Sequence, residues 1–282
     1  MLEQRTKPGM MSHSRVVCEA PDQPMRPLDE HCYKLACILS TSASEEWEPD
    51  CPEWNQARGW LDLASGVKRV EIITGLLDEC SRFCGTAAEY EDARSQAVSD
   101  YYTELTRFLF TWGAFETAVE AVKPPDWRNG KIRAVGRFLA RRFDPDKLIH
   151  YRCAVSRLKQ SGIKDSDFSP DGGYGESGIG IRVVYKLRNR LSHGSLEFPE
   201  PEDWGGSPRL DTTVARLATR IVLLTIQMML ITHFAGTSVL IKYRDNSKED
   251  SDEMQEEAQA DTCAIGSLLR EIHVNRAIDV VW

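Results

Sequence analysis

The sequence predicts an all-α protein, a helical bundle with one long apolar helix at its centre. Apolar residues recur every three or four positions through Ser99–Val122, which is the spacing of one face of a helix. Thr213–Ala235 is the most apolar stretch, and its polar interruptions favour a core helix over a membrane span, which needs about 20 apolar residues. No segment alternates apolar and polar residues in a way that predicts a strand. These observations favour helices packed on helices.

Composition places the chain among soluble globular proteins. It has 282 residues, of which 41% are hydrophobic and 28% are charged, enough to bury a substantial core. A formal net charge of −8 and a pI near 5.4 argue against a protein that coats nucleic acid non-specifically. We expect a loose arm and a small, mainly helical accessory module over residues 1–95, a helical domain over 96–243, and an acidic linker with a C-terminal helix over 244–282.

The cysteines predict neither a redox centre nor a metal site. The eight cysteines include no Cys-x-x-Cys pair. The nearest approach to a metal cluster has a spacing that fits no common zinc pattern, and it consists of His31, Cys32, Cys37 and Cys51. We therefore expect no metal and no other cofactor. The first 30 residues lack the apolar region of a secretory signal, so we expect a cytoplasmic protein with free thiols.

Two shorter segments also show helical spacing. A helix is predicted in the N-terminal part, through Val67, Val70, Ile73, Leu76 and Leu77. A second, amphipathic helix is predicted near the C-terminus, through Ile265, Leu268, Leu269 and Ile272. Before it, Arg244–Asp261 carries eight acidic residues against two basic ones. We interpret this run as a solvated linker, with an acidic strip that shields a basic surface as the alternative.

The helix predicted over Ser99–Val122 contains one residue that does not suit a plain core. Lys123-Pro124-Pro125 stops this helix, because proline cannot continue it. Glu116 lies four residues after Trp112 and three before Val119, so its carboxylate points where the apolar side chains point. A buried carboxylate needs a cationic or hydrogen-bonding partner. The alternative is that Glu116 lies at the edge of the apolar stripe and reaches water.

Residues 128–164 carry a net positive charge in a chain that is negative overall, with eleven basic residues against two acidic ones. Such a concentration in an acidic protein is a candidate footprint for phosphates. The equal alternative is a helical hairpin with a solvated basic face. Three residues of this stretch are the candidate RNA contacts: Arg137, Arg141 and Arg142.

The polar segment Ser166–Gly180 contains five glycines, and residues 173–178 formally match G-x-G-x-x-G. No apolar strand precedes the match and no acidic residue follows about twenty positions on, as dinucleotide binding requires. A mobile connector, one that covers a site, is the better interpretation.

The helix predicted over Ile179–His193 carries the side chains best suited to chemistry. Arg188, Asn189, Arg190 and His193 stand on its polar surface, and Asn189 and His193 lie four residues apart on one side. Arg188 is about 140° from His193 around an ideal helix. An imidazole can move a proton to or from a ribose hydroxyl or a leaving oxygen, while a guanidinium stabilises the charge on a phosphate. Together they are a minimal kit for cleaving RNA, whose 2′-hydroxyl supplies the nucleophile.

Two motifs resemble a known superfamily. RNRLSHG at residues 188–194 is similar to the R-N-x-x-x-H form of the R-x₄₋₆-H motif of the HEPN superfamily. RFLFTWGAFETAVEAV at residues 107–122 resembles the aromatic helix of its Apea-like members. The two occur in the expected order with a long apolar helix after them, and the resemblance covers roughly residues 96–243. The segment between the Glu116 helix and the motif is longer and richer in glycine than a minimal domain needs.

The resemblance implies an antiparallel helical bundle that dimerises, so that the motif helices of two subunits form one cleft. It implies a metal-independent endoribonuclease that leaves 2′,3′-cyclic phosphate and 5′-hydroxyl ends, acting as a toxin or anti-phage effector with a possible antitoxin or defence-system partner. Arg188 and His193 match the two catalytic positions and Asn189 the polar residue after the arginine. Glu116 would match an acidic residue that orients the motif, and Arg190 would be an auxiliary phosphate contact.

Two other functions remain open at this stage. The first is a catalytically inactive HEPN-like module that binds RNA or protein as a dimer. The second is a plain structural helical protein in which the motif is coincidental, with Arg188 and His193 on unrelated surfaces. An RNA cleavage assay in EDTA separates the enzyme from both.

Overall fold

The structure is a computed structural model in which part of the chain is described. The described residues are 24–41, 51–77, 79, 83–169, 173–193, 198–237, 239–245, 261–275 and 278–280. Residues 1–23 of the expected N-terminal arm, residues 170–172 of the glycine-rich segment and residues 246–260 of the acidic run lie outside the described residues, so the predictions made for them stay predictions.

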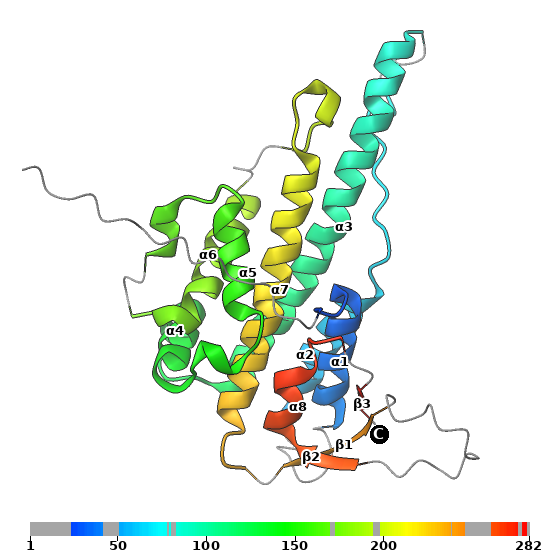
Figure 1. Cartoon of the computed structure of the whole chain (residues 1–282). Coiled ribbons are helices and arrows are strands. Elements are labelled where there is room, and N and C mark those ends of the chain that lie inside the picture. Colours follow the sequence, from blue (N-terminus) through cyan, green and yellow to red (C-terminus); the bar gives the residue numbers. More distant parts are fainter. Residues whose placement is uncertain are drawn as a thin grey trace, which may run out of the picture.

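The fold is mainly helical, as the sequence predicts, and is organised around two long helices. α3 (Gly85–Val122) and α7 (Pro208–His233) lie side by side through the middle of the molecule (Figure 1). α7 is long and apolar enough to cross a membrane by length and composition alone, but 83% of its most apolar window is buried within the protein. The expected core helix is therefore confirmed. α3 ends where predicted, with Lys123 in a left-handed conformation (φ 50°) and its N–H bonded to the Val119 carbonyl.

Shorter helices cover the two flanks of this pair. α1 (Leu28–Thr41) and α2 (Pro52–Gly66) pack together on one flank. α4 (Lys131–Arg142), α5 (Tyr151–Gln160) and α6 (Gly175–Ser192) gather on the other side of α7 (Figure 1). Short 3₁₀ turns connect these elements: η2 (Trp127–Asn129), η3 (Pro145–Lys147), η4 (Asp165–Phe168) and η5 (Glu202–Trp204).

One hydrophobic core runs through the three expected parts of the chain. It includes Leu35 of α1, Phe115 of α3, Ile226 of α7 and Leu269 of the C-terminal segment, all at most 1% exposed. The expected boundary between residues 95 and 96 falls inside α3. The N-terminal helices therefore pack directly on the central pair.

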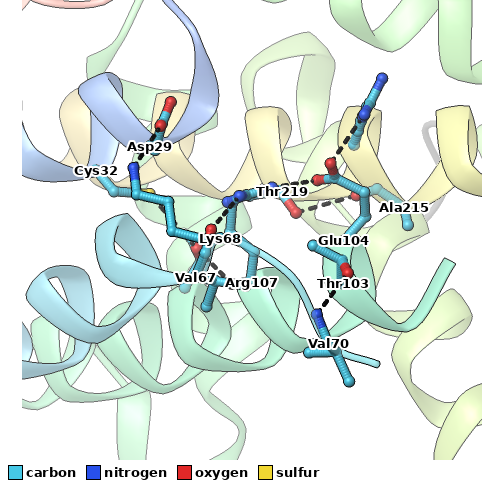
Figure 2. Close-up of polar contacts among 12 residues, drawn as sticks. Asp29, Cys32, Val67, Lys68, Val70, Thr103, Glu104, Arg107, Ala215 and Thr219 are labelled. Carbon is cyan, nitrogen blue, oxygen red and sulfur yellow. Dashed lines mark hydrogen bonds and ion pairs between the residues drawn. The ribbon is translucent and has the colours of Figure 1, made fainter. Parts of the chain in front are cut away.

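The segment after α2 is extended, so the helix predicted through Val67–Leu77 is wrong. Three backbone N–H groups of this strap (residues 67–74) donate to hydroxyls on α3: Val70 to Thr103, Ile72 to Ser99 and Thr74 to Ser95, each at 2.9 Å (Figure 2 shows Val70 and Thr103). The donors on the strap are two residues apart and the hydroxyls on α3 are four residues apart. Two extended residues advance about 6.6 Å and four helical residues about 6 Å, so donors and acceptors stay opposite each other along the two segments. β-branched residues crowd this strap and favour the extended form.

Glycine lets α4 and α6 approach closely, which accounts for part of the glycine content of the segment before and within α6. α6 begins at Gly175, earlier than the predicted Ile179 and inside the expected connector. A Cβ on Gly178 would lie 2.6 Å from the Cα of Gly136 on α4, so the two helices touch because Gly178 has no side chain. The G-x-G-x-x-G match therefore serves helix packing at its last position.

A small antiparallel sheet near the C-terminus was not predicted. Its strands are β1 (Leu240–Asp245), β2 (Asp261–Ala264) and β3 (Ile278–Val280), in the order β2-β1-β3. Ile241 pairs with Cys263, and an isolated bridge joins Met25 to Val274. The predicted C-terminal helix is confirmed as α8 (Ile265–Glu271), which buries Ile265, Leu268 and Leu269. Each strand is too short for an alternating pattern to stand out.

Candidate functional site

The motif residues lie at the C-terminal end of α6, at the surface. Arg188 and Asn189 are half-buried on its last turns and His193 is exposed directly after the helix, with its backbone N–H bonded to the Asn189 carbonyl at 3.0 Å. Among the described residues, neither the Arg188 guanidinium nor the His193 imidazole makes a hydrogen bond or an ion pair. Both groups are therefore available to a ligand.

Within one chain, the Glu116 carboxylate bonds to a neighbour on its own helix, and the orienting role expected of it stays a prediction. Its Oε1 accepts a hydrogen bond of 2.8 Å from Nε1 of Trp112, one turn earlier on α3, and the residue is half-buried. The carboxylate thus lies at the edge of the apolar stripe, which was the alternative interpretation. Trp112 in turn stacks on Tyr185 of α6, with ring centroids 6.2 Å apart. Glu116 and the motif helix therefore face the same junction without a direct bond among the described residues.

Arg190 is engaged by a carboxylate rather than free for phosphate. Its Nη2 donates to Asp167 Oδ2 at 2.9 Å, and Lys186 donates to the other oxygen of Asp167 at 2.7 Å. The hydrogen bond from Lys186 and the nearby positive charges lower the pKa of the Asp167 carboxyl. Arg190 therefore fastens the end of α6 to the preceding turn, and the auxiliary RNA contact expected of it is opposed by this ion pair.

The basic stretch forms an exposed surface on α4 and α5, as either interpretation of it requires. Arg137, Arg141 and Arg142 are exposed on α4, and the Arg142 guanidinium lies over the Phe138 ring at 5.4 Å. Part of the charge is neutralised locally, because Arg152 pairs with both Asp146 and Glu176, and Lys131 with Glu120. A basic face remains around the α4 arginines.

A second cluster of arginine and histidine, which no sequence pattern indicates, lies in the core. Arg220 Nη1 donates to His31 Nδ1 at 2.8 Å, and His31 Nε2 then donates to Gln227 Oε1 at 2.7 Å. The Gln227 amide donates to the Leu269 carbonyl and to His273 Nδ1, and His273 Nε2 donates to the Ile149 carbonyl at 2.8 Å. Because arginine can only donate, this chain of bonds fixes both histidines as neutral tautomers.

Burial opposes protonation of the two histidines in this core network. Desolvation, with Arg220 nearby, lowers the pKa of His31 well below its ordinary value and that of His273 to about 3. Desolvation also lowers the pKa of Arg220 to about 10. Both nitrogens of the His31 ring are occupied, so it has no lone pair free for a metal. In the part of the chain that is described, no group of three or more His, Cys, Asp or Glu could hold a metal ion.

A buried charge cluster joins α3, α7 and the strap. Glu104 accepts from Arg107 through Oε2 and from Arg216 of α7 through Oε1 at 2.9 Å, while Arg107 also donates to the Val67 carbonyl at 2.6 Å (Figure 2). These residues line a cavity of about 920 Å³. Its wall mixes five basic with four acidic side chains, so it favours neither sign of ligand. We interpret the cluster as a brace between elements.

Comparison with known proteins adds no relative. The chain matches no family model, no curated protein and no solved structure. The resemblance to the HEPN superfamily therefore depends on the two motifs quoted above and on their places in a helical fold.

Proposed function

We propose that this protein is a metal-independent endoribonuclease of the HEPN type that acts as a homodimer, as a toxin or anti-phage effector. The observation that carries the proposal is the solvent access and the lack of bonding partners of the Arg188 and His193 side chains. Both lie at the end of α6 within reach of solvent, and neither side chain has a partner among the described residues. An arginine and a histidine that reach solvent at the end of one helix, and that no other side chain holds among the described residues, are candidates for chemistry.

The proposed reaction uses the ribose of the substrate as its nucleophile. His193 takes the proton of the 2′-hydroxyl or gives a proton to the leaving 5′-oxygen. Arg188 donates hydrogen bonds to the phosphate oxygens and stabilises the extra negative charge of the five-coordinate transition state. The 2′-oxygen forms a bond to phosphorus as the bond to the 5′-oxygen breaks, which leaves a 2′,3′-cyclic phosphate and a 5′-hydroxyl. Asn189 would position the phosphate beside them.

Helix geometry supports a site made by two subunits. Arg188 and His193 are five residues apart, so they point about 140° from each other around α6. Within one chain the arginine must lean across the helix to reach the histidine. If two copies of α6 face each other across a two-fold axis, Arg188 of one subunit meets His193 of its partner. The exposed arginines of α4 would then guide the RNA backbone, with Arg137, Arg141 and Arg142 as contacts.

The test is cleavage of mixed RNA by the purified protein in EDTA, followed by analysis of the ends. We expect products with 5′-hydroxyl ends that a kinase labels without prior phosphatase treatment, and 2′,3′-cyclic phosphate at the other end. Cleavage that EDTA abolishes, or products with 5′-phosphate ends, would overturn the proposal. RNA binding without any cleavage would favour the inactive binding module instead.

Mixing two inactive variants tests the shared site. Arg188→Ala and His193→Ala should each lose cleavage alone, yet a heterodimer of the two keeps one intact pair. An equal mixture that exchanges subunits should recover about a quarter of the wild-type activity, because half of the dimers are mixed and each has one working site of two. No recovery, with mixed dimers shown to form, would place the site within one chain. Arg270→Ala, an exposed arginine on α8 outside the basic stretch, serves as the matched control.

A further inference from the structure

A pocket of about 600 Å³ lies beside the end of α6 and is used by nothing described above. Its floor is apolar and comes from α3, α6 and α7, with Phe108, Leu187, Val214 and Ala218 among its residues. This volume is within the range of small-molecule sites, which combine apolar walls with a few polar groups. Leu187, Arg190 and Leu191 place the pocket on the same last turns of α6 that carry Arg188 and His193.

Two polar side chains that line this pocket have no hydrogen-bond partner within the described part of the chain. Asp211, in the first turns of α7, is half-buried and its carboxylate has no hydrogen bond or ion pair among the described residues. The Tyr101 side chain on α3 is buried, and its hydroxyl is likewise unbonded within the described part. Desolvation raises the pKa of Asp211, and burial followed by the charge of Asp211 raises the pKa of Tyr101 to about 12. Both groups line the same pocket, one as an acceptor and one as a donor.

Aromatic rings stand at the mouth of the pocket. Phe198 and Trp204 line it while remaining 62% and 45% exposed, so their faces are open to a flat ligand. Trp204 is held in place, because its ring packs edge-on against Tyr90 of α3 at 5.1 Å and Tyr90 donates to Glu200 at 2.6 Å. The backbone around Trp204 makes a close turn, because a Cβ on Gly206 would lie 1.8 Å from the Glu200 carbonyl oxygen.

We infer that this pocket binds a guanine base of the RNA, with the Asp211 carboxylate accepting from N1–H and the exocyclic amine and the Tyr101 hydroxyl donating to O6. Guanine is the base that presents two adjacent donors beside a carbonyl, which matches one carboxylate beside one hydroxyl. Adenine and cytosine place a ring nitrogen lone pair against the carboxylate, and uracil offers a single donor between two acceptors. Stacking on Phe198 and Trp204 holds the plane of the base, since aromatic side chains stack on single-stranded bases.

The pocket gives the proposed ribonuclease a sequence preference, and in this respect the inference depends on the proposed function. Both sites lie on α6, whose diameter with side chains is about 10–12 Å, so a base in the pocket belongs to a nucleotide close to the cleaved bond. Cleavage should therefore occur next to guanine. The binding of guanine itself requires no catalysis.

Binding is measured first, by calorimetry on the His193→Ala protein with 5′-GMP, 5′-AMP, 5′-CMP and 5′-UMP. We expect GMP to bind about 10- to 100-fold more tightly than the others, the discrimination that a bidentate pair provides. Asp211→Asn should remove that preference, while Tyr101→Phe, which keeps the ring, should weaken GMP several-fold. Asp203→Asn, an exposed carboxylate in the turn that carries Trp204, is the matched control and should change nothing. Equal binding of all four nucleotides, or of none, overturns the inference.

Cleavage maps then separate the two proposals. If the wild-type protein cuts RNA next to guanine and Asp211→Asn cuts without preference, both stand. If it cuts RNA in EDTA with no base preference and GMP does not bind, the pocket is wrong and the ribonuclease remains. If GMP binds through Asp211 but no RNA is cut, the ribonuclease is wrong and the guanine pocket remains.

Discussion

Arginine and histidine come together in two regions of this chain, in opposite surroundings. In the core, Arg220 and His31 are both buried and share a hydrogen bond of 2.8 Å. At the end of α6, Arg188 and His193 are on one helix, and among the described residues their side chains bond to nothing. The same two residue types therefore stabilise the fold in one region and are left to solvent in the other.

The two pairs differ in their hydrogen bonding: the polar groups of the core pair are bonded within the protein, while those of the proposed site are left open to a ligand. A buried donor or acceptor without a partner costs about 1–3 kcal/mol, so a buried histidine contributes most to stability when both ring nitrogens are bonded. His31 and His273 meet this condition. A ring bonded in this way cannot exchange a proton with a substrate. An exposed ring carries no such penalty, because water satisfies it.

The largest expected effect is on activity at the open pair. His193→Ala should lower RNA cleavage by about 10²- to 10⁴-fold, the usual contribution of a general acid or base. The free energy of unfolding should change by less than about 0.5 kcal/mol, because the side chain is exposed. Cleavage rates and urea unfolding of the same preparation measure both. Cleavage that survives in the folded variant would remove His193 from the site.

The second effect is on stability at the closed cluster. Gln227→Leu keeps a similar volume but leaves His31 Nε2–H, His273 Nδ1 and the Leu269 carbonyl without their partner. We expect a loss of about 2–4 kcal/mol in the free energy of unfolding, measured in urea. Gln160→Leu, at an exposed position on α5, is the control. A Gln227 variant as stable as the control would show that the network does not hold the fold.

The third effect is a pH dependence that the core histidines impose on stability. Their pKa values lie below the ordinary 6.5 in the folded state, with His273 at about 3, so the unfolded chain binds more protons as the pH falls. Stability should therefore be complete above about pH 6.5 and fall towards pH 3, by up to about 1.4 kcal/mol per pH unit for each histidine. Urea unfolding at several pH values measures the slope. His273→Gln should make the slope shallower, and an unchanged slope would exclude His273 as its source.

Periodicity predicted the parts of this fold that depend on one continuous apolar face. α7, the C-terminal half of α3 and α8 were found in this way, because each buries a stripe at helical spacing. The helix predicted for the strap was wrong because its apolar residues fit helical spacing by chance. The backbone of the strap is held by hydroxyls on α3 more than twenty residues away. The β-branched residues of the strap favour an extended backbone, and this local preference was a better guide here than the spacing of the apolar residues.

In the candidate sites too, residues close together in the sequence were predicted and residues far apart were not. Arg188, Asn189 and His193 could be named because they are local to one helix, and so a spacing describes them. The core network could not, since His31 and Gln227 are 196 residues apart and no local pattern relates them. The hydrogen-bonding partner expected for a half-buried Glu116 is the indole N–H of Trp112, four residues earlier, and the sequence alone does not distinguish this donor from others nearby.

The smallest expected effect tests the comparison within a single helix. Arg190 lies two residues after Arg188, yet Asp167 already holds its guanidinium at 2.9 Å. If existing ion pairs decide which arginine acts on RNA, Arg190→Gln should change cleavage by less than about threefold. The variant should lose about 1 kcal/mol of stability, because the guanidinium is partly exposed and Lys186 still pairs with the buried Asp167 carboxylate. Arg188→Gln on the same helix should lose most of the cleavage and little stability. Equal losses from the two variants would mean that the charge of α6 as a whole attracts RNA, and that the free guanidinium of Arg188 has no particular role.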